Sequence, residues 1–420
     1  MRRVFHTISV IGLGYIGLPT AAMFASRKIK VVGVDINENA VATINAGGVH
    51  IVEPDLDIAV RSAVEQGYLR ATSAPEPAEA FLIAVPTPFR DGHQPDLSYI
   101  EAAARAIAPV LEPGNLVVLE STSPVGTTEQ LAQWLAEERT DLTFPQTHGE
   151  NSDIRIAYCP ERVLPGNVMR ELIDNDRLLG GLSPRCSEVA TSLYKSFVRG
   201  QCMVTHARTA EMAKLTENSF RDVNIAFANE LSVICDKLDI DVWELIELAN
   251  LHPRVNILQP GAGVGGHCIA VDPWFIVSRT PEEARLIRTA RDVNDAKPRW
   301  VVEKIEAAIG AHLEHEPSKS PADVRVACYG LAFKPDIDDL RESPAVEIAA
   351  ELSRRHDGPL LAVEPHVRNL PNSLARFQLV SEAEARGSAD VHVLLVDHRA
   401  FERRAPTPGE LVDVRGYWTV

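Results

Sequence analysis

The sequence predicts an α/β protein in which two Rossmann-like, parallel-sheet domains are joined by a central domain built on a long helix. Two observations carry this prediction. Strand-like apolar runs alternate with helical patterns toward both ends of the chain, and a long stretch of three- and four-residue apolar spacing separates them. With 420 residues, 45% hydrophobic and 24% charged, the chain has the size and composition of a globular protein of two or three domains.

The N-terminal domain is expected to span residues 1–204. Its candidate strands are apolar runs at residues 8–11, 31–35, 81–85 and 116–120, with helix-like stretches between them. This alternation predicts a parallel sheet, because a chain that crosses over through a helix returns to the same end of the sheet.

The central domain, residues 205–314, begins with a predicted long helix from about residue 205 to 248. Such a helix bridges domains or forms a dimer face. Its apolar positions recur at helical steps: Met212, Leu215, Phe220, Val223, Ile225, Phe227, Leu231, Ile234 and Leu238. A polar, proline-containing segment at 315–321 predicts a boundary, and further strand candidates predict a second, smaller α/β domain over residues 315–420.

Composition limits the partners. The net charge of −16 and the absence of a Lys/Arg run argue against a nucleic-acid partner. No apolar run approaches the ~20 residues of a membrane span, and the N-terminus leads into a strand-like run, so we expect a cytoplasmic protein without a membrane partner. The six cysteines lack paired or metal-type spacing, which favours reduced thiols and no metal site.

A glycine fingerprint follows the first candidate strand and opens a helix. In Gly12-Leu13-Gly14-Tyr15-Ile16-Gly17, the first glycine permits a tight turn, the second lets a pyrophosphate approach, and the third allows close helix packing. Asp35 closes the next strand, where its carboxylate can accept hydrogen bonds from both ribose hydroxyls and would repel a 2′-phosphate. We therefore expect NAD rather than NADP, with FAD as the weaker alternative.

The candidate catalytic residue is Cys268, in the glycine-dense segment 261–272. Glycines let the backbone approach a ligand closely, so a cysteine among them can meet a substrate carbon. An isolated cysteine is more often a buried small hydrophobe, and the rest of the chain decides between these interpretations. Lys214 and Asn218 stand four residues apart in the predicted long helix, so they project from one face toward the same site.

Several motifs together resemble the UDP-glucose/GDP-mannose dehydrogenase family across nearly the whole chain. They lie at residues 12–17, 121–128, 160–163, 211–218, 265–272, 333–334 and 341–343. The segments 263–277 and 284–291 most resemble family members that act on UDP-N-acetyl-D-mannosamine for bacterial polysaccharide biosynthesis. The resemblance implies a four-electron oxidation of the sugar C6 alcohol to a carboxylate, which consumes two NAD+ and one water.

The resemblance also implies catalytic roles. Cys268, as a thiolate, captures the C6 aldehyde as a thiohemiacetal, which becomes a thioester that water cleaves. Lys214 acts as a base on the C6 oxygen and then stabilises the oxyanion, while Asn218 holds the same oxygen or an ordered water. Three further residues match family positions that orient the lysine or hold and activate the water: Asp272, Glu161 and Thr122.

Binding residues follow from the same resemblance. For NAD it adds Tyr15, Ile16, Thr87, Thr128 and Arg341 to the glycines and Asp35. For the nucleotide sugar it points to Arg162, Val163, Lys214, Asn218, Arg221, His252, Arg254, Gly265, Phe333 and Lys334. In this family Arg254 reaches across a dimer interface, so a homodimer is implied. His267 is expected to shape the pocket or contact the substrate rather than to pair with the nucleophile.

Other functions stay open at this point. The oxidised sugar depends on pocket contours, so UDP-N-acetylglucosamine and UDP-glucose are alternatives. A two-electron hydroxyacid or 6-phosphogluconate-type dehydrogenase shares the fingerprint and the long helix, but a single hydride transfer needs no thiol. A third alternative is an inactive nucleotide-sugar-binding protein, against which the intact Cys268, Lys214 and Asn218 argue.

Overall fold

The computed structural model describes residues 4–164, 166–266 and 268–419. They form two compact units. The first contains the chain up to Glu217 together with Trp274–Thr280, and the second contains Asn218–Pro273 and the chain from Pro281 onward. The boundary therefore falls inside two helices, α9 (Ala207–Lys237) and α11 (Asp272–Arg279).

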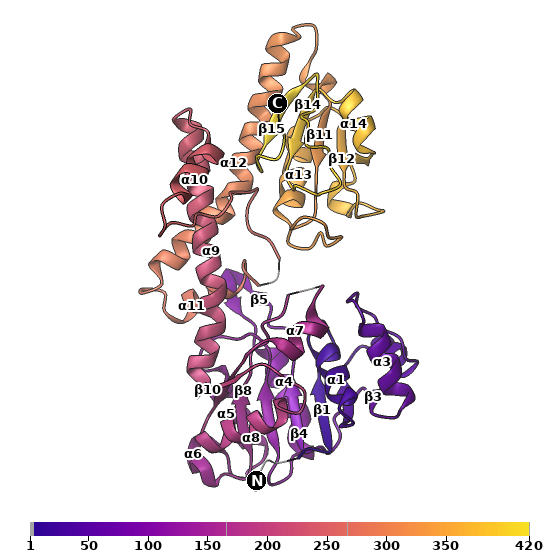
Figure 1. Ribbon diagram of the computed structural model, residues 1–420, viewed down its shortest axis with the longest axis vertical. Coiled ribbons are helices and arrows are strands. Elements are labelled where there is room, and N and C mark those ends of the chain that lie inside the picture. The colour runs from indigo at the N-terminus through magenta and orange to yellow at the C-terminus, as the bar shows by residue number, and fades with distance from the viewer. Residues whose placement is uncertain (1–3, 165, 267, 420) are drawn as a thin grey trace. The chain divides into compact units, whose positions relative to one another are not determined.

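The first unit is built on an eight-stranded sheet with the strand order β10-β9-β8-β7-β4-β1-β2-β3 (Figure 1). The strands are β1 (Thr7–Ile11), β2 (Lys30–Val34), β3 (Leu69–Thr72), β4 (Ala80–Ile83), β7 (Leu116–Leu119), β8 (Arg155–Tyr158), β9 (Arg177–Gly181) and β10 (Cys202–His206). Their pairings are parallel apart from β8 with β9, which is antiparallel. The α/β prediction is confirmed, and the reversal at β9 is a feature that the apolar pattern did not indicate.

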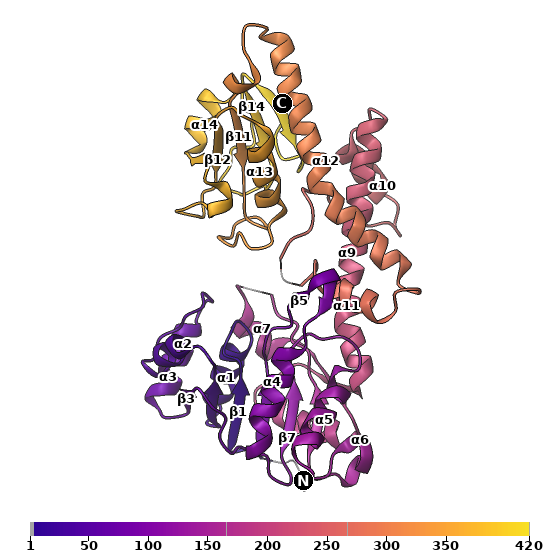
Figure 2. The same cartoon turned by 180° about the vertical axis from the view of Figure 1, so that it is seen from behind.

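Helices cover both faces of this sheet (Figure 2). They are α1 (Gly17–Ser26), α2 (Glu38–Asn45), α3 (Leu56–Glu65), α4 (Ser98–Ile107), α5 (Thr127–Glu138), α6 (Pro145–His148), α7 (Val168–Asp174) and α8 (Pro184–Tyr194). Leu82 of β4 packs in the cluster that contains α1, whereas its neighbour Phe81 packs in the cluster that contains α4 and α5. Burial on both faces is the reason that the central strands are continuous apolar runs. A small hairpin pairs β5 (Phe89–Arg90) with β6 (Gln94–Pro95).

The long helix is shorter than predicted. Instead of continuing to residue 248, α9 ends at Lys237 and α10 (Val242–Asn250) follows. Asp239 lies between them with φ +56°, which no helix accommodates. The Asp241 carboxylate then caps α10 by accepting hydrogen bonds from the N–H groups of Trp243 and Glu244. Apolar spacing carried on through this break, which is why the pattern alone missed it.

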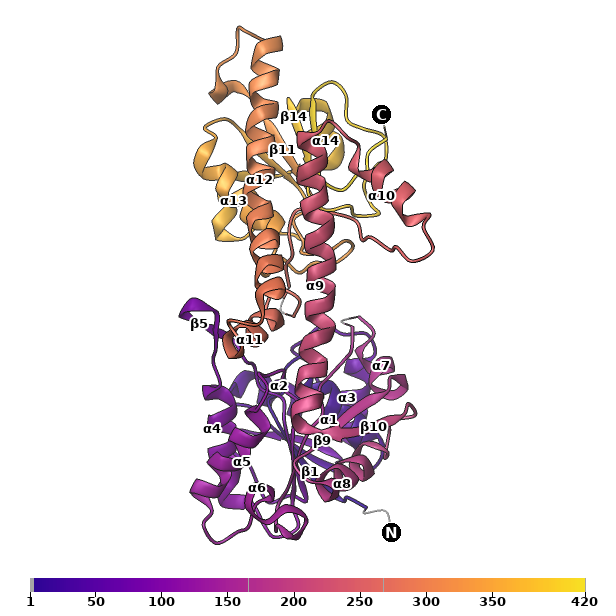
Figure 3. The same ribbon diagram turned by 90° about the vertical axis from the view of Figure 1, so that its left-hand side faces the viewer.

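The second unit contains a five-stranded parallel sheet with the order β13-β12-β11-β14-β15. Its elements are β11 (Val326–Tyr329), β12 (Leu360–Val363), β13 (Phe377–Leu379), β14 (Val391–Leu394), β15 (Glu410–Asp413), α12 (Arg285–His315), α13 (Pro344–Arg355) and α14 (Glu382–Ser388). Val301 of α12 and Ile348 of α13 share one hydrophobic cluster (Figure 3), and Ala385 of α14 belongs to another. The predicted second α/β domain is thus confirmed as a parallel sheet with covering helices.

Helix α12 was not predicted from the sequence, although it is 31 residues long. It contains Pro298, which lacks an N–H and argues against a helix interior. Short 3₁₀ turns complete the structure at Asp91–His93, Ala108–Val110, Gly149–Asn151, Pro321–Asp323 and Asn372–Leu374. Among the described residues, none of the helices has both the length and the apolar character to cross a bilayer.

Candidate functional site

The glycine turn after β1 has the geometry that a dinucleotide requires. Gly12 has φ +89°, and a Cβ on it would lie 2.7 Å from the carbonyl oxygen of Ala84. A Cβ on Gly17 would lie 1.8 Å from the carbonyl oxygen of Gly12, so α1 packs directly on the turn. In contrast, a Cβ on Gly14 would meet nothing within 4 Å, which leaves space for a pyrophosphate beside the backbone.

Asp35 follows β2 and contacts the same turn. Its Oδ2 accepts a hydrogen bond from the N–H of Leu13 at 2.9 Å, and its Oδ1 accepts one from the N–H of Asn37 at 2.9 Å. Because β1 lies between β4 and β2, the strand order reverses here, and open α/β sheets bind ligands at such a point. In the loop after β4, the buried Thr87 hydroxyl has no hydrogen-bond partner among the described residues. These features fit NAD.

The loop after β7 is held by a buried carboxylate from α9. Glu211 accepts hydrogen bonds from the N–H of Gly126 at 2.7 Å, from the N–H of Thr128 at 2.8 Å and from the Thr128 hydroxyl at 2.6 Å. Burial raises the pKa of Glu211, and these three hydrogen bonds oppose the shift. Thr122 is half-buried in the same loop. Thr128 as an NAD contact stays a prediction, and both its donors face Glu211 here.

Glu161 belongs to a buried polar cluster. Its Oε2 accepts a hydrogen bond from Arg177 at 2.5 Å, and its Oε1 accepts one from the N–H of Arg162 at 2.7 Å. Arg177 is 3% exposed, so this ion pair is desolvated. Close by, Glu120 accepts a hydrogen bond from the Tyr194 hydroxyl. Arg177, Glu120 and Tyr194 were not predicted from the sequence. The available signal was the charged residue directly after β7 and at the start of β9.

The predicted substrate residue Arg162 already has a partner. Its Nε and Nη2 contact the carboxylate of Glu217 at 3.1 and 2.8 Å. Val163 is half-buried and packs against the core of the first unit. A phosphate that approached Arg162 would therefore compete with Glu217 for the guanidinium.

The second unit joins three of the predicted catalytic residues. Asn218 Nδ2 donates a hydrogen bond to Asp272 Oδ2 at 2.5 Å. The carbonyl oxygen of Cys268 accepts hydrogen bonds from the N–H groups of Val271 and Asp272, at 3.1 and 2.9 Å, so the cysteine lies in the turn that opens α11. All six cysteines are described, and Cys268 is the exposed one. His267 lies outside the described residues.

The cysteine loop is in close contact with the segment before α13. A Cβ on Gly265 would lie 2.3 Å from the carbonyl oxygen of Glu342 and 3.2 Å from the Phe333 side chain. Lys334 Nζ lies 5.8 Å from the Phe333 ring, and Arg341 pairs with Asp339 at 2.7 Å. The predicted contacts Arg221, His252 and Arg254 are exposed. Gly265 and Phe333 are therefore neighbours, and their contact with the nucleotide sugar stays a prediction.

The catalytic candidates divide between the units. Thr122, Glu161 and Lys214 lie in the first, whereas Asn218, Cys268 and Asp272 lie in the second. Lys214 is 9% exposed and stands one helical turn before Asn218 in α9. The assignment of all six to one reaction is a proposal that we take up below.

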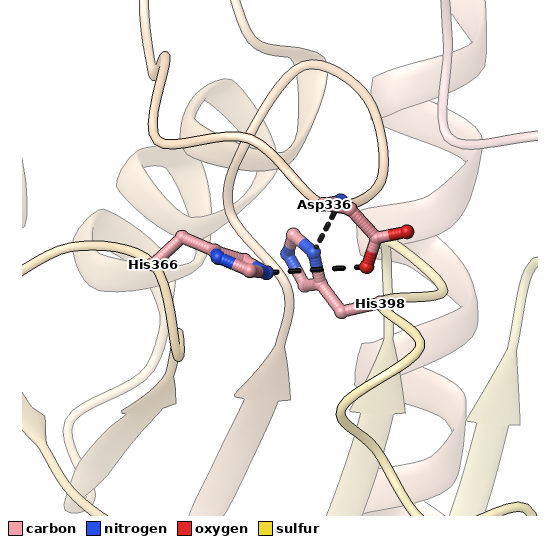
Figure 4. Close-up of side chains that lie close together, drawn as sticks. All are labelled: Asp336, His366 and His398. Carbon is pink, nitrogen blue, oxygen red and sulfur yellow. Dashed lines mark hydrogen bonds and ion pairs between the residues drawn. The ribbon is translucent and has the colours of Figure 1, made fainter.

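One further group of side chains has the composition of a metal site. Asp336, His366 and His398 lie close together in the second unit (Figure 4). However, His398 Nδ1 accepts a hydrogen bond from the Asp336 N–H at 2.9 Å, and Nε2 lies 3.0 Å from Glu364 Oε2. The Asp336 carboxylate binds Arg399. Because both ring nitrogens of His398 and the Asp336 carboxylate are engaged, this group is a structural cluster rather than a set of ligands.

Known proteins resemble this chain along most of its length. Three domain models of the UDP-glucose/GDP-mannose dehydrogenase family match the chain: the NAD binding domain at residues 6–198, the central domain at 208–296 and the UDP binding domain at 327–419. The chain is 64% identical to a UDP-N-acetyl-D-mannosamine dehydrogenase of Yersinia pestis, over 99% of each chain. It is 63% identical to an NDP-N-acetyl-D-galactosaminuronic acid dehydrogenase of Ralstonia nicotianae, over 99% of this chain and 97% of the relative.

A solved structure gives the same result for the fold. The UDP-D-ManNAc dehydrogenase of Pyrococcus horikoshii superposes with a TM-score of 0.85 at 37% identity, covering 98% of this chain and 99% of the other. The family resemblance and the expected cofactor NAD are thereby confirmed.

Two glycines of the fingerprint provide a matched test. Gly14→Ala adds a methyl group where the protein leaves space, so we expect an unchanged melting temperature and an NAD affinity at least about tenfold lower. Gly17→Ala forces a methyl group against the Gly12 carbonyl, so we expect a loss of about 1–3 kcal/mol of unfolding free energy. Thermal unfolding and NAD titration calorimetry measure both. Equal effects of the two variants on stability would contradict this assignment.

Glu120 makes stability depend on pH. Burial raises its pKa from 4.5 to about 7, although the Tyr194 hydrogen bond opposes the shift. Its contribution to stability is therefore complete below pH 4.5 and is lost as the pH rises through about 7. We expect Glu120→Gln, which keeps the shape of the protonated acid, to stabilise the protein by about 3 kcal/mol at pH 8 and by little at pH 4.5. Urea unfolding at both pH values measures the difference, and a gain that did not change with pH would disprove this role.

Proposed function

Because the chain belongs to the UDP-glucose/GDP-mannose dehydrogenase family, we propose that it oxidises the C6 alcohol of UDP-N-acetyl-D-mannosamine to the carboxylate of UDP-N-acetyl-D-mannosaminuronate. The observation that carries this proposal is the exposed Cys268 in a turn that hydrogen bonds link to Asp272 and Asn218. A thiol is needed only when an aldehyde is oxidised further, so its position favours a four-electron reaction over a two-electron one.

NAD would be held by the glycine turn and its neighbours in the N-terminal domain, together with Arg341 of the C-terminal domain. The proposed contacts are Gly12, Gly14, Tyr15, Ile16, Gly17, Asp35, Thr87, Thr128 and Arg341. When bound, NAD accepts a hydride from the substrate carbon. The residues of the turn supply backbone N–H groups for the pyrophosphate, and Asp35 supplies acceptors for the ribose hydroxyls.

The chain's own side chains supply the remaining chemistry. Lys214 removes the proton of the C6 hydroxyl, and its cation then stabilises the oxygen anion. Asn218 holds the same oxygen, and its amide is fixed by the 2.5 Å hydrogen bond to Asp272. Cys268 adds its sulfur to the C6 aldehyde to give a thiohemiacetal, which loses a hydride to become a thioester.

Water completes the reaction. It adds to the thioester carbonyl, the carbon–sulfur bond breaks, and the carboxylate leaves while the thiol regains its proton. Glu161 and Thr122 are the residues that we propose to hold this water. Glu161 is held in place by its ion pair with Arg177 and by the hydrogen bond from the N–H of Arg162. Two NAD+ and one water are consumed for each sugar.

The nucleotide sugar would contact residues from all three domains that we propose, 1–204, 205–314 and 315–420. The three family segments support this division. The proposed contacts are Arg162, Val163, Lys214, Asn218, Arg221, His252, Arg254, Gly265, Phe333 and Lys334. Their positive charges would offset the diphosphate in a chain of net charge −16. We place the reaction in the cytoplasm, where NAD is available.

The comparisons also support a second candidate substrate, an N-acetylgalactosamine nucleotide. The relative at 63% identity carries the name of an NDP-N-acetyl-D-galactosaminuronic acid dehydrogenase. This identity differs by one percentage point from that of the mannosamine enzyme, so sequence similarity favours neither sugar strongly. Both names refer to N-acetylated amino sugars, and we therefore propose the acetamido group as the shared determinant.

The decisive measurement is the amount of NADH formed for each sugar consumed. We expect two NADH per UDP-N-acetyl-D-mannosamine and a kcat/KM at least about tenfold above that for UDP-N-acetylgalactosamine, UDP-N-acetylglucosamine and UDP-glucose. Cys268→Ser is the matched control, and we expect it to lower acid formation at least about 100-fold while NAD binding is unchanged. One NADH per sugar, or full turnover by Cys268→Ser, would rule out the thioester route.

We further propose a homodimer in which α9 forms the contact. Phe220 is 67% exposed, Phe227 53% and Leu238 61%, and their spacing places them on one face of α9 and its C-terminal end. An apolar stripe of this kind on a helix marks an interface. Arg254 would then reach the sugar site of the second copy, as the family resemblance implies.

The oligomeric state tests this face. We expect the native protein to be a dimer in light scattering, and Phe227→Glu with Leu238→Glu to lower its association constant at least about 100-fold, because two charges would be buried without partners. Ile58→Glu, at an equally exposed apolar residue of α3, is the control that should stay dimeric. A monomeric native protein would exclude the proposal.

A further inference from the structure

The loop that leads to Cys268 is anchored by side chains rather than by secondary structure. The N–H of Gly261 donates a hydrogen bond to Asn229 Oδ1 at 2.9 Å, and the carbonyl oxygen of Pro260 accepts one from Arg415 Nη1 at 3.0 Å. Further along, the N–H of Gly266 reaches the Glu342 carbonyl only at 3.4 Å. The entry of the loop is therefore fixed more tightly than its middle, and Asn229 on α9 is its fully buried anchor.

The orientation of the Asn229 amide is set by other buried groups. Its Nδ2 donates to Asn294 Oδ1 at 2.9 Å, and Asn294 Nδ2 donates to Asp222 Oδ1 at 2.8 Å. Arg291 donates to the same carboxylate oxygen at 2.6 Å. We call Arg291, Asp222, Asn294 and Asn229 the anchor chain. All four are at most 2% exposed.

The anchor chain is directional because one end carries charge. A carboxylate only accepts hydrogen bonds, so Asp222 must receive the NH₂ group of Asn294. Asn294 then presents its oxygen to Asn229, which must turn its own NH₂ toward it. The Asn229 oxygen is left to face Gly261. Reversal of either amide would bring two acceptors together, so the ion pair fixes the acceptor at the entry of the cysteine loop.

In a purely structural element, this arrangement would lower the free energy of unfolding. Asp222 Oδ2 and Arg291 Nε are buried and have no hydrogen-bond partner among the described residues. A buried ion pair with unmet polar atoms stabilises a fold less than apolar side chains of similar size. Leucines at these positions would stabilise the packing between α9 and α12 equally well. The presence of polar residues therefore needs another explanation.

We propose that the anchor chain positions the cysteine loop for reaction, with Asn229 as a positioning residue that acts through Gly261 on Cys268. The inference rests on the proposed function in one respect, which is that Cys268 is the nucleophile. A thiolate must meet the aldehyde carbon within a few tenths of an ångström of the productive geometry, and small displacements from remote mutations lower turnover about 100-fold.

Hydrogen exchange tests the anchor without any substrate. Asn229→Leu has a similar volume but accepts no hydrogen bond, so we expect amide exchange in the peptide that contains Gly261 to rise at least about tenfold. Asn294→Leu does not touch the loop, yet it frees the Asn229 amide to rotate, and we expect the same change in smaller degree. Ser232→Ala, in the same helix interface, is the control and should leave this exchange unchanged. Unchanged exchange in Asn229→Leu would overturn the proposal.

Measurements of turnover distinguish a positioning role of Asn229 from a purely stabilising one. We expect Asn229→Leu to lower kcat at least about tenfold with the KM for NAD within about twofold, since the NAD contacts of the glycine turn lie in the other unit. Asn229→Asp keeps an acceptor for Gly261 but buries a charge beside the Asn294 oxygen. It should therefore melt below Asn229→Leu and yet have the higher kcat. Activities that follow the melting temperatures would show a merely structural role and overturn the inference.

Hydrogen exchange and turnover together distinguish a failure of this inference from a failure of the proposed function. If the native protein formed no NADH with any sugar, the proposed function would fail while the exchange data would still decide whether Asn229 anchors the loop. If turnover were normal and exchange at Gly261 were the same in all variants, the anchor chain would have no positioning role and the proposed function would stand.

Discussion

Helix α9 buries a row of polar side chains, and most of the candidate site depends on the partners that these side chains require. Its polar residues recur at three-, four- and seven-residue steps on one face, which is buried or half-buried: Glu211, Lys214, Asn218, Asp222 and Asn229. A helix buries polar side chains only where these side chains find hydrogen-bond or ion-pair partners. In the first unit the partner comes from α5, and in the second unit the partners come from α11, α12 and the cysteine loop. Small or aliphatic residues such as Leu215 and Ala228 are buried with them, whereas the aromatic Phe220 and Phe227 are exposed.

Both sheets use the same device to hold the turn after their first strand. In the first unit, Asp35 accepts a hydrogen bond from the N–H of Leu13, next to Gly12 at φ +89°. In the second, Glu364 accepts one at 2.7 Å from the N–H of Leu331, next to Gly330 at φ +79°. The difference lies in what else binds the carboxylate. Glu364 is fully buried against His398, whereas Asp35 is half-buried and keeps lone pairs for a ligand. Of the two carboxylates, Asp35 is thus the one with acceptors available to a ligand.

Local chemistry explains which features the sequence could predict. Gly12, Gly17 and the apolar strands were predictable because close packing and burial on both faces require particular residues at short range. The break at Asp239 and the helix through Pro298 were not, since tertiary packing overrides the local preference at both. The anchor chain and the pair of Glu161 with Arg177 join residues that are distant in sequence, and no periodicity marks such pairs. Cys268 was recognised by its glycines, but its link to Asn218 through Asp272 needed coordinates.

The exposure of Cys268 has a cost in the life of the catalyst. An exposed sulfur is open to hydrogen peroxide, and a thiolate is oxidised to a sulfenic acid and then beyond repair. Burial raises the pKa of Cys159 and raises that of Cys328 to about 12, so these two sulfurs are held as thiols. With Cys268 as the nucleophile that we propose, oxidation of this one sulfur would stop turnover while the fold stayed intact.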